Sequence, residues 1–254
     1  MAKMLRDTWL LFLSNLRTTW RSPIWIIIGL FQPICYLLLF APLLKNLAGS
    51  PGFPRTGAYN VFTPGLLIII ALYSASFVGF NLIDWLRSGM LERLRVTPVS
   101  RLALLSGLVI RDVLLLLVQC ALLIGLALIM GFRPDVVGLL ILVPLLVIVA
   151  VLMASCSYAL ALATKDEGAL ASTINLFVLP LSLLSGIMLP LTLAPEVLRN
   201  IAKFNPFTYA VDAARALVAG NTTDVSVARA FVIFALLAVL GVIWATRSLR
   251  QAMM

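Results

Sequence analysis

The residue types that carry most acid–base and metal chemistry are scarce in this chain of 254 residues. It contains no histidine, and three cysteines stand singly inside apolar runs, namely Cys35, Cys120 and Cys156. Isolated cysteines of this kind are typical of small buried side chains, whereas metal and redox sites need paired spacings such as CxxC. The only adjacent acids, Asp166 and Glu167, belong to a segment 165–168 that we interpret as a tight turn. We therefore predict no catalytic and no metal-binding residues.

Polar and charged residues gather instead in two stretches between apolar blocks. The first, 84–101, carries four arginines and two acids, and Pro98 should end any helix built from the residues before it. Leu91 and Leu94 share one helical face beside Glu92. A plain surface loop explains the arginines, but a short charged helix with an apolar tip is typical of a segment that binds in a partner's groove.

The second stretch, 192–220, predicts two short helices. Pro195 suits the first turn of one helix, which continues to Lys203. Asn205 can cap a second helix that has Pro206 at its first position and ends at Gly220. Both helices are too short or too polar to cross a bilayer. They form either a simple cap over one mouth of the protein or a gate.

The composition of the chain indicates the environment in which these two polar stretches lie. Apolar residues make up 62% of the chain and charged residues 11%, against about 45–50% and 25% in ordinary soluble domains. A soluble domain could not bury that much apolar surface, so a soluble, disordered or fibrous protein is excluded. The net charge of +9 would suggest nucleic acid in a soluble protein. Here the basic residues lie between apolar blocks, which favours anchoring and orientation in a membrane and no nucleic-acid partner.

Six segments are apolar for about 20 residues, the length that crosses a bilayer as a helix. They are 24–44, 61–83, 113–130, 136–163, 169–191 and 227–245. Residues 99–112 are expected to approach the third span as a helix, which places Arg111 and Asp112 at the membrane edge. Residues 4–21 form an amphipathic helix that lies in the interface, as an anchor or also as part of a docking surface. The expected fold is thus all-α and polytopic, with a short helical hairpin before the last span.

The distribution of basic residues predicts the orientation. Six spans place both termini on one side, and twelve of the 19 Lys and Arg residues fall on that side. Because basic residues are enriched in cytoplasmic loops, both termini should be cytoplasmic. The first apolar block is long enough to stay as a span, so we expect no cleavable signal peptide.

The two polar stretches carry a family resemblance. Residues 89–101 resemble the cytoplasmic motif of ABC-2 type transporter permeases, which include the daunorubicin-resistance permeases. Asn205 to Tyr209, followed by Asp212 and Arg215, is similar to that family's second hallmark before the last span. The amphipathic start, the six spans and the cytoplasmic termini extend the resemblance over nearly the whole chain.

The resemblance implies a single transmembrane domain, 1–254, in the cell membrane among lipids. Such a domain pairs with a second copy or a paralogue and exports its cargo. Each permease docks a separate ATPase subunit that binds ATP and magnesium; this chain has no GxxxxGK[ST] loop and should bind no cofactor itself. The segment 85–98 would be the coupling helix. The implied ATPase-coupling residues are Leu91, Glu92, Leu94, Thr97 and Pro98, and the implied external-gate residues are Asn205, Pro206, Tyr209, Asp212 and Arg215.

Three alternatives compete with this reading. An ion-coupled secondary transporter usually keeps an ionisable group near the middle of the membrane, and we expect every acid here at the ends of spans or in loops. A membrane enzyme would have to work without histidine. Within the transporter reading, apolar walls favour an amphipathic drug or a lipid as cargo. Tyr36, Tyr73 and Tyr158 keep a lipid-linked polysaccharide open as the alternative cargo.

Overall fold

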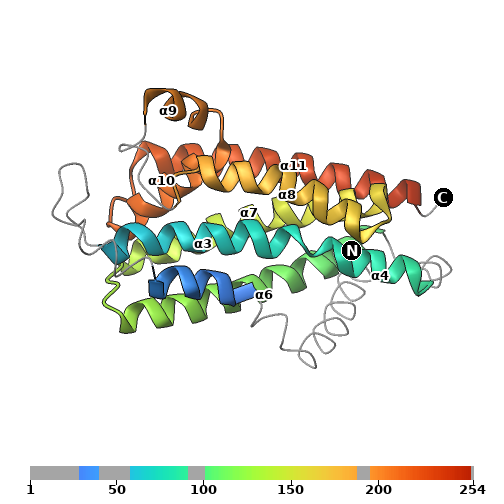
Figure 1. Cartoon of the computed structure of the whole chain (residues 1–254), viewed down its shortest axis with the longest axis horizontal. Helices are drawn as coiled ribbons and strands as arrows, with labels where there is room; N and C mark the ends of the chain where they lie inside the picture. The colour runs from blue at the N-terminus through green and yellow to red at the C-terminus, as the bar shows by residue number, and fades with distance from the viewer. Residues whose placement is uncertain (1–28, 40–57, 91–100, 188–194, 253–254) are drawn as a thin grey trace.

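The computed structural model of the chain describes residues 29–39, 58–90, 101–187 and 195–252. All regular elements within these ranges are α-helices. The long helices lie roughly along the long axis of the molecule (Figure 1). Within these described ranges, five helical segments are long and apolar enough to cross a membrane. The predicted all-α, multi-pass membrane architecture is therefore confirmed.

The described helices include the expected spans, although the bounds of some differ, together with shorter helices between them. They are α3 (Ala58–Ser76), α4 (Gly79–Arg87), α6 (Arg101–Ile129), α7 (Val136–Thr164), α8 (Glu167–Leu184), α9 (Glu196–Ala202), α10 (Pro206–Val218) and α11 (Val225–Ala252). A shorter apolar helix, Gly29–Leu39, is the described part of the first expected span. The amphipathic helix expected at 4–21 lies outside the described residues.

Helix α7 lies at the centre of the packing and contacts α3, α4, α6, α8, α10 and α11. Its sequence is mostly Leu, Val, Ile and Ala, so it can bury apolar surface on several sides at once. Asp135 caps its first turn by accepting a bond from the Gly138 N–H at 2.7 Å. Lys165 ends it in the left-handed conformation, and Asp166 then caps α8, which confirms the predicted tight turn.

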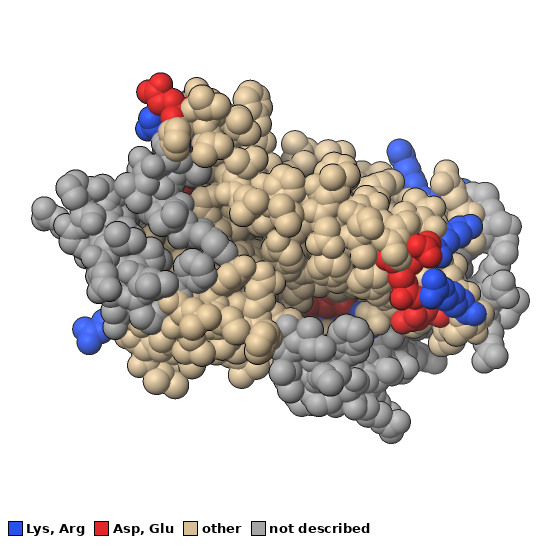
Figure 2. Space-filling model, in the orientation of Figure 1, with Lys and Arg blue, Asp and Glu red and all other residues tan. Residues whose placement is uncertain are grey.

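The two ends of the bundle differ in what they contain. The end of α4, the turn between α7 and α8 and the C-terminal part of α11 lie at one end, which we call the α4 end (Figure 1). Helices α9 and α10 lie at the opposite end, the α10 end. On the face seen in Figure 2, most charged groups gather toward the two ends and the surface between them is mostly uncharged. Exposed side chains such as Leu176, Phe177 and Leu236 contribute to the apolar exterior, which suits contact with hydrocarbon.

The second expected span is interrupted where the sequence predicted one helix. It consists of α3 and α4, separated at Phe77 and Val78. Apolar periodicity alone cannot reveal this break, because both residues are as apolar as their neighbours. The reason lies in α7, whose Ser157 bonds to the backbone on both sides of the interruption.

The predicted ends of the last two spans also need correction. Helix α8 ends at Leu184 rather than at residue 191, because Ser185 and a left-handed Gly186 (φ +72°) turn the chain. The apolar residues after that turn hid the end of the helix in the sequence. Helix α11 continues to Ala252 instead of ending at residue 245. Its last turns carry Arg247 and Arg250, and a helix does not have to end where its apolar run ends.

Candidate functional site

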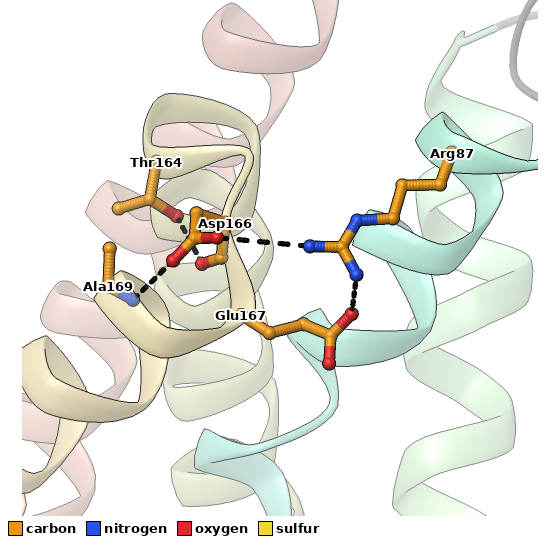
Figure 3. Close-up of polar contacts among 5 residues, drawn as sticks. All are labelled: Arg87, Thr164, Asp166, Glu167 and Ala169. Atoms are coloured by element: carbon orange, nitrogen blue, oxygen red, sulfur yellow. Dashed lines mark hydrogen bonds and ion pairs between the residues drawn. The ribbon is translucent and has the colours of Figure 1, made fainter.

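Three polar clusters lie along the bundle, and the first is at the α4 end. Arg87, the last residue of α4, forms an ion pair with Glu167 and places a second guanidinium nitrogen 3.8 Å from Asp166 (Figure 3). Asp166 also accepts a bond from the Ala169 N–H at 2.8 Å, which fixes the first turn of α8. Arg87 thus joins the end of α4 to the turn between α7 and α8. All three charged side chains remain exposed to solvent.

The expected coupling residues begin just beyond Arg87. Leu91, Glu92, Leu94, Thr97 and Pro98 lie outside the described residues. The described start of the segment 85–98 is not one helix, because α4 ends at Arg87 and Ser88 follows as its C-cap. Gly89 then adopts a left-handed backbone (φ +69°), a conformation that glycine tolerates at no steric cost. Residues 85–87 thus belong to the end of α4, and the coupling helix expected at 85–98 stays a prediction.

The second cluster is buried inside the bundle and links α6 to α7. The Arg111 Nε lies 2.9 Å from the Asp112 carboxylate, and the Tyr158 hydroxyl donates to the other carboxylate oxygen. The Arg111 and Asp112 side chains are only 7% and 2% exposed, and Tyr158 is completely buried. The sequence placed the Arg111–Asp112 pair at a membrane edge, where water would solvate it. In the fold, the two charges instead neutralise each other, and the Tyr158 hydroxyl adds a hydrogen bond to the Asp112 carboxylate.

Next to Tyr158, Ser157 forms hydrogen bonds to the backbone on both sides of the interruption between α3 and α4. Its hydroxyl donates to the Ser76 carbonyl and accepts from the Gly79 N–H at 2.9 Å. Both backbone groups would otherwise be buried without a partner at the helix break. A Cβ on Gly79 would lie 2.7 Å from the Ser157 backbone oxygen, so only glycine allows the two helices to approach this closely.

The third cluster, at the α10 end, contains the residues expected to form an external gate. Asn205 caps α10 by accepting from the Phe207 N–H at 3.0 Å, and its amide donates to the Leu181 carbonyl at 2.7 Å. Pro206 occupies the first position of α10, as predicted. The Tyr209 hydroxyl donates to the Lys203 carbonyl at 2.9 Å, which ties α10 to the turn after α9. One side of α10 is buried against α11, α3 and α7, so α10 packs as part of the bundle.

Arg215 is the most highly connected of the expected gate residues. Its guanidinium donates to the Val61 carbonyl at 3.1 Å and to the Gly186 and Ile187 carbonyls at 2.8 and 3.3 Å. It thereby joins α10 to the first turn of α3 and to the chain after α8. The carbonyl oxygens near the end of α8 carry partial negative charge, so a cation there is favourable.

The electrostatics of α10 follow from its position. Desolvation lowers the pKa of Arg215, with the charge of Asp212 acting in the opposite direction. Desolvation also raises the pKa of Asp212, although part of its surface stays open; Arg215 opposes this shift and Asp224 adds to it. Asp212 and Arg215 lie three residues apart on α10, and the hydrogen bonds of Arg215 go to backbone carbonyls. The expected gate residues are thus brought together on α10, with Asn205 and Arg215 holding its two ends.

Sequence reasoning missed three contacts that the fold creates. The Tyr158–Asp112 bond, the Ser157 bridge and the Arg87–Glu167 pair each join residues at least 46 positions apart. A polar residue inside an apolar run was the only signal available for Tyr158 and Ser157. Among the described residues, no group of three or more acids and cysteines could hold a metal ion.

The sequence also matches known proteins. A profile of the ABC-2 type transporter family matches residues 6–219. The chain belongs to the ABC-2 type transporter family. It is 31% identical over 206 residues to a protein of Pyropia yezoensis described as the transport permease ycf38, with 78% of this chain and 69% of the relative covered.

Two relatives of this ABC-2 chain have names that refer to drug resistance. One is a daunorubicin resistance ABC transporter permease protein, DrrB1, of Streptomyces coeruleorubidus, 27% identical with 82% of this chain and 76% of the relative covered. Another is described as the doxorubicin resistance permease DrrC of Mycobacterium tuberculosis, 26% identical with coverages of 84% and 77%. The ABC-2 chain is therefore a multi-pass membrane component of an ABC exporter.

Proposed function

We propose that this chain is the permease subunit that forms the export path for an amphipathic drug or a lipid. The observation that carries the proposal is the match to the ABC-2 family together with relatives named for daunorubicin and doxorubicin resistance. The clustered polar groups support it, because they leave long apolar helix faces between the two ends of the bundle. Tyr158, which a polysaccharide path could have used as a stacking platform, is fully buried and bonded to Asp112.

We propose further that a separate ATPase drives transport. This chain has no phosphate-binding loop, so ATP and magnesium would bind to the partner. The residues that would contact the ATPase are Leu91, Glu92, Leu94, Thr97 and Pro98. We call residues 91–98 the docking segment. Their position between α4 and α6 suits this role, because a force on the docking segment would act on α6 directly and on α3 through α4.

The remaining parts of the assembly complete the proposal. The single domain, 1–254, would pair with a second copy or a paralogue in the cell membrane, with both termini in the cytoplasm. The α4 end would then face the ATPase and the α10 end the outside. Asn205, Pro206, Tyr209, Asp212 and Arg215 would form the external gate.

The test of the proposed function replaces Glu92 with Gln or Pro98 with Ala in the full chain. The chain is purified together with the ATPase that its own cells supply and placed in vesicles of phosphatidylethanolamine and phosphatidylglycerol. We expect each variant to insert normally into the membrane. The permease-dependent stimulation of the ATPase should fall by a factor of about five or more, the usual size of a coupling between two sites.

The matched control is Lys203→Gln, which changes an exposed charge at the α10 end. It should stimulate the ATPase as the unmodified chain does. Undiminished stimulation in both Glu92→Gln and Pro98→Ala would contradict the proposed docking segment. An unmodified chain that neither binds nor stimulates an ATPase would contradict the proposed function as a whole.

A further inference from the structure

The cluster of Arg87, Asp166 and Glu167 is too exposed for a contribution to stability alone to explain it. Arg87 is 56% exposed, and its two acidic partners are 60% and 43% exposed. Exposed ion pairs contribute little to stability, because water screens the charges and the side chains lose freedom. Yet this one guanidinium contacts two neighbouring acids, the N-cap and the first residue of α8, which are 79 and 80 positions away in sequence (Figure 3).

The position of Arg87 gives the contact a mechanical consequence. It lies four residues before Leu91, the first of the expected coupling residues, and the left-handed Gly89 separates the two. Its partners lie in the turn between α7, the helix with the most neighbours, and α8. Toward its N-terminal end, α4 is held to α7 by apolar packing and by the hydrogen bond between the Gly79 N–H and the Ser157 hydroxyl. The charged bridge is thus the polar connection nearest to the docking segment among the described residues.

We propose that Arg87 is a positioning residue that transmits movement of the docking segment to α7 and α8 through Glu167 and Asp166. The inference rests on the proposed function, in which an ATPase moves the segment after Gly89. With the bridge intact, the end of α4 and the α7–α8 turn move together. Without it, α4 can bend at its C-terminal end while α7 stays in place, so that the ATPase still binds but its movement is not passed on.

The roles of the two acids differ, and this difference guides the choice of variants. Asp166 caps α8 through the Ala169 N–H, so its replacement would also disturb the helix. Glu167 makes the closer contact to Arg87 and caps nothing. Arg87→Gln therefore removes both ion pairs and Glu167→Gln removes the closer one, each with little change in shape. Arg87→Lys keeps the charge but offers only one nitrogen, so it should retain part of the function.

The experiment compares these variants with the unmodified chain, co-purified with the ATPase in the vesicles described above. We expect Arg87→Gln and Glu167→Gln to bind the ATPase and to melt as the unmodified chain does. Each should lose about fivefold or more of the ATPase stimulation. The double variant should lose no more than Arg87→Gln alone, because Arg87→Gln already removes the contact to Glu167.

The matched control is Glu196→Gln. It breaks the exposed Glu196–Arg199 pair, with its 3.7 Å separation, at the opposite end of the bundle, and should leave stimulation unchanged. Normal stimulation by Arg87→Gln and Glu167→Gln would overturn the inference while leaving the proposed function standing. Loss of ATPase binding would also overturn it, because the residues would then belong to the docking surface. An unmodified chain without any ATPase partner would overturn both proposals.

Discussion

The buried Arg111–Asp112–Tyr158 cluster shows how one residue's environment is set by its partners. A charge taken out of water is tolerated only when a counter-charge and hydrogen bonds replace the lost hydration. Asp112 receives bonds on both of its oxygens, from Arg111 and from Tyr158. The exposed Arg87 pair and this buried pair therefore differ in kind. One partner of the exposed pair can be removed at little cost, whereas removal of one partner of the buried pair leaves an uncompensated buried charge.

Removal of one partner from the buried cluster should be severe. Asp112→Ala leaves the Arg111 guanidinium buried without a counter-charge, and we expect it to lower the free energy of unfolding by about 3–5 kcal/mol. Tyr158→Phe removes one hydrogen bond to a charged group and should cost about 2 kcal/mol. The midpoint of thermal unfolding of the full chain in detergent micelles measures both effects.

The control for this prediction removes both charges together. A double variant, Arg111→Leu with Asp112→Leu, fills the same space with apolar groups, and such exchanges are often neutral or stabilising. It should therefore unfold at a higher temperature than Asp112→Ala. If Asp112→Ala were as stable as the unmodified chain, the burial and pairing of Arg111 would be wrong.

At the scale of elements, the break between α3 and α4 depends on close packing against α7. Gly79 brings α4 close to α7, and the Ser157 hydroxyl binds the backbone on both sides of the break. Serine side chains commonly re-satisfy backbone groups freed inside membrane helices, because no water is available to do so. The interruption is thus a built feature of the span, held by one side chain of the neighbouring helix.

We expect Gly79→Ala to be destabilising by about 1–3 kcal/mol, because the added methyl group overpacks the α4–α7 contact. Its Cβ would meet the Ser157 backbone oxygen and hydroxyl, both at 2.7 Å. Gly125→Ala in α6 is the matched control, since a Cβ there meets nothing within 4 Å. That change should be neutral or slightly stabilising, because alanine favours helix over glycine. Equal unfolding temperatures for the two variants would show that α4 and α7 are not in close contact.

For the whole molecule, the placement of charge predicts which end faces which side of the membrane. Twelve of the 19 Lys and Arg residues fall on the side expected to hold both termini and the stretch 84–101, and basic residues favour the cytoplasmic side. The bundle supports a consistent assignment, since α4, the α7–α8 turn and the end of α11 lie at one end and α9 and α10 at the other (Figure 1).

Labelling of introduced cysteines tests this orientation. Ser88→Cys and Asn200→Cys are both exposed positions, at the α4 end and the α10 end respectively. A membrane-impermeant maleimide should label Asn200→Cys in intact cells and Ser88→Cys only after the membrane is opened. The unmodified chain, whose native cysteines are buried or half-buried, serves as the blank. Labelling of Ser88→Cys alone in intact cells would reverse the proposed orientation.

Features that depend on neighbours in the chain were predictable from the sequence. The apolar runs identified the spans because burial in hydrocarbon demands about 20 apolar residues in a row. The cap at Asn205, the proline at the first position of α10 and the tight turn at residues 165–168 follow local rules and were confirmed. The ends of α8 and α11 were harder to locate, since hydropathy records composition and not where a helix begins or ends.

The arrangement of the polar clusters was decided only by tertiary structure. Tyr158 reaches Asp112 across 46 positions, Ser157 reaches Ser76 across 81, and Arg215 reaches Val61 across 154. No local pattern encodes such pairs, because their cause is the need to satisfy polar groups wherever packed helices bring them together. The amino-acid order thus determined that this protein is a helical membrane protein of the ABC-2 type. Helix packing determined how its buried charges are neutralised and how its two ends are tied to the bundle.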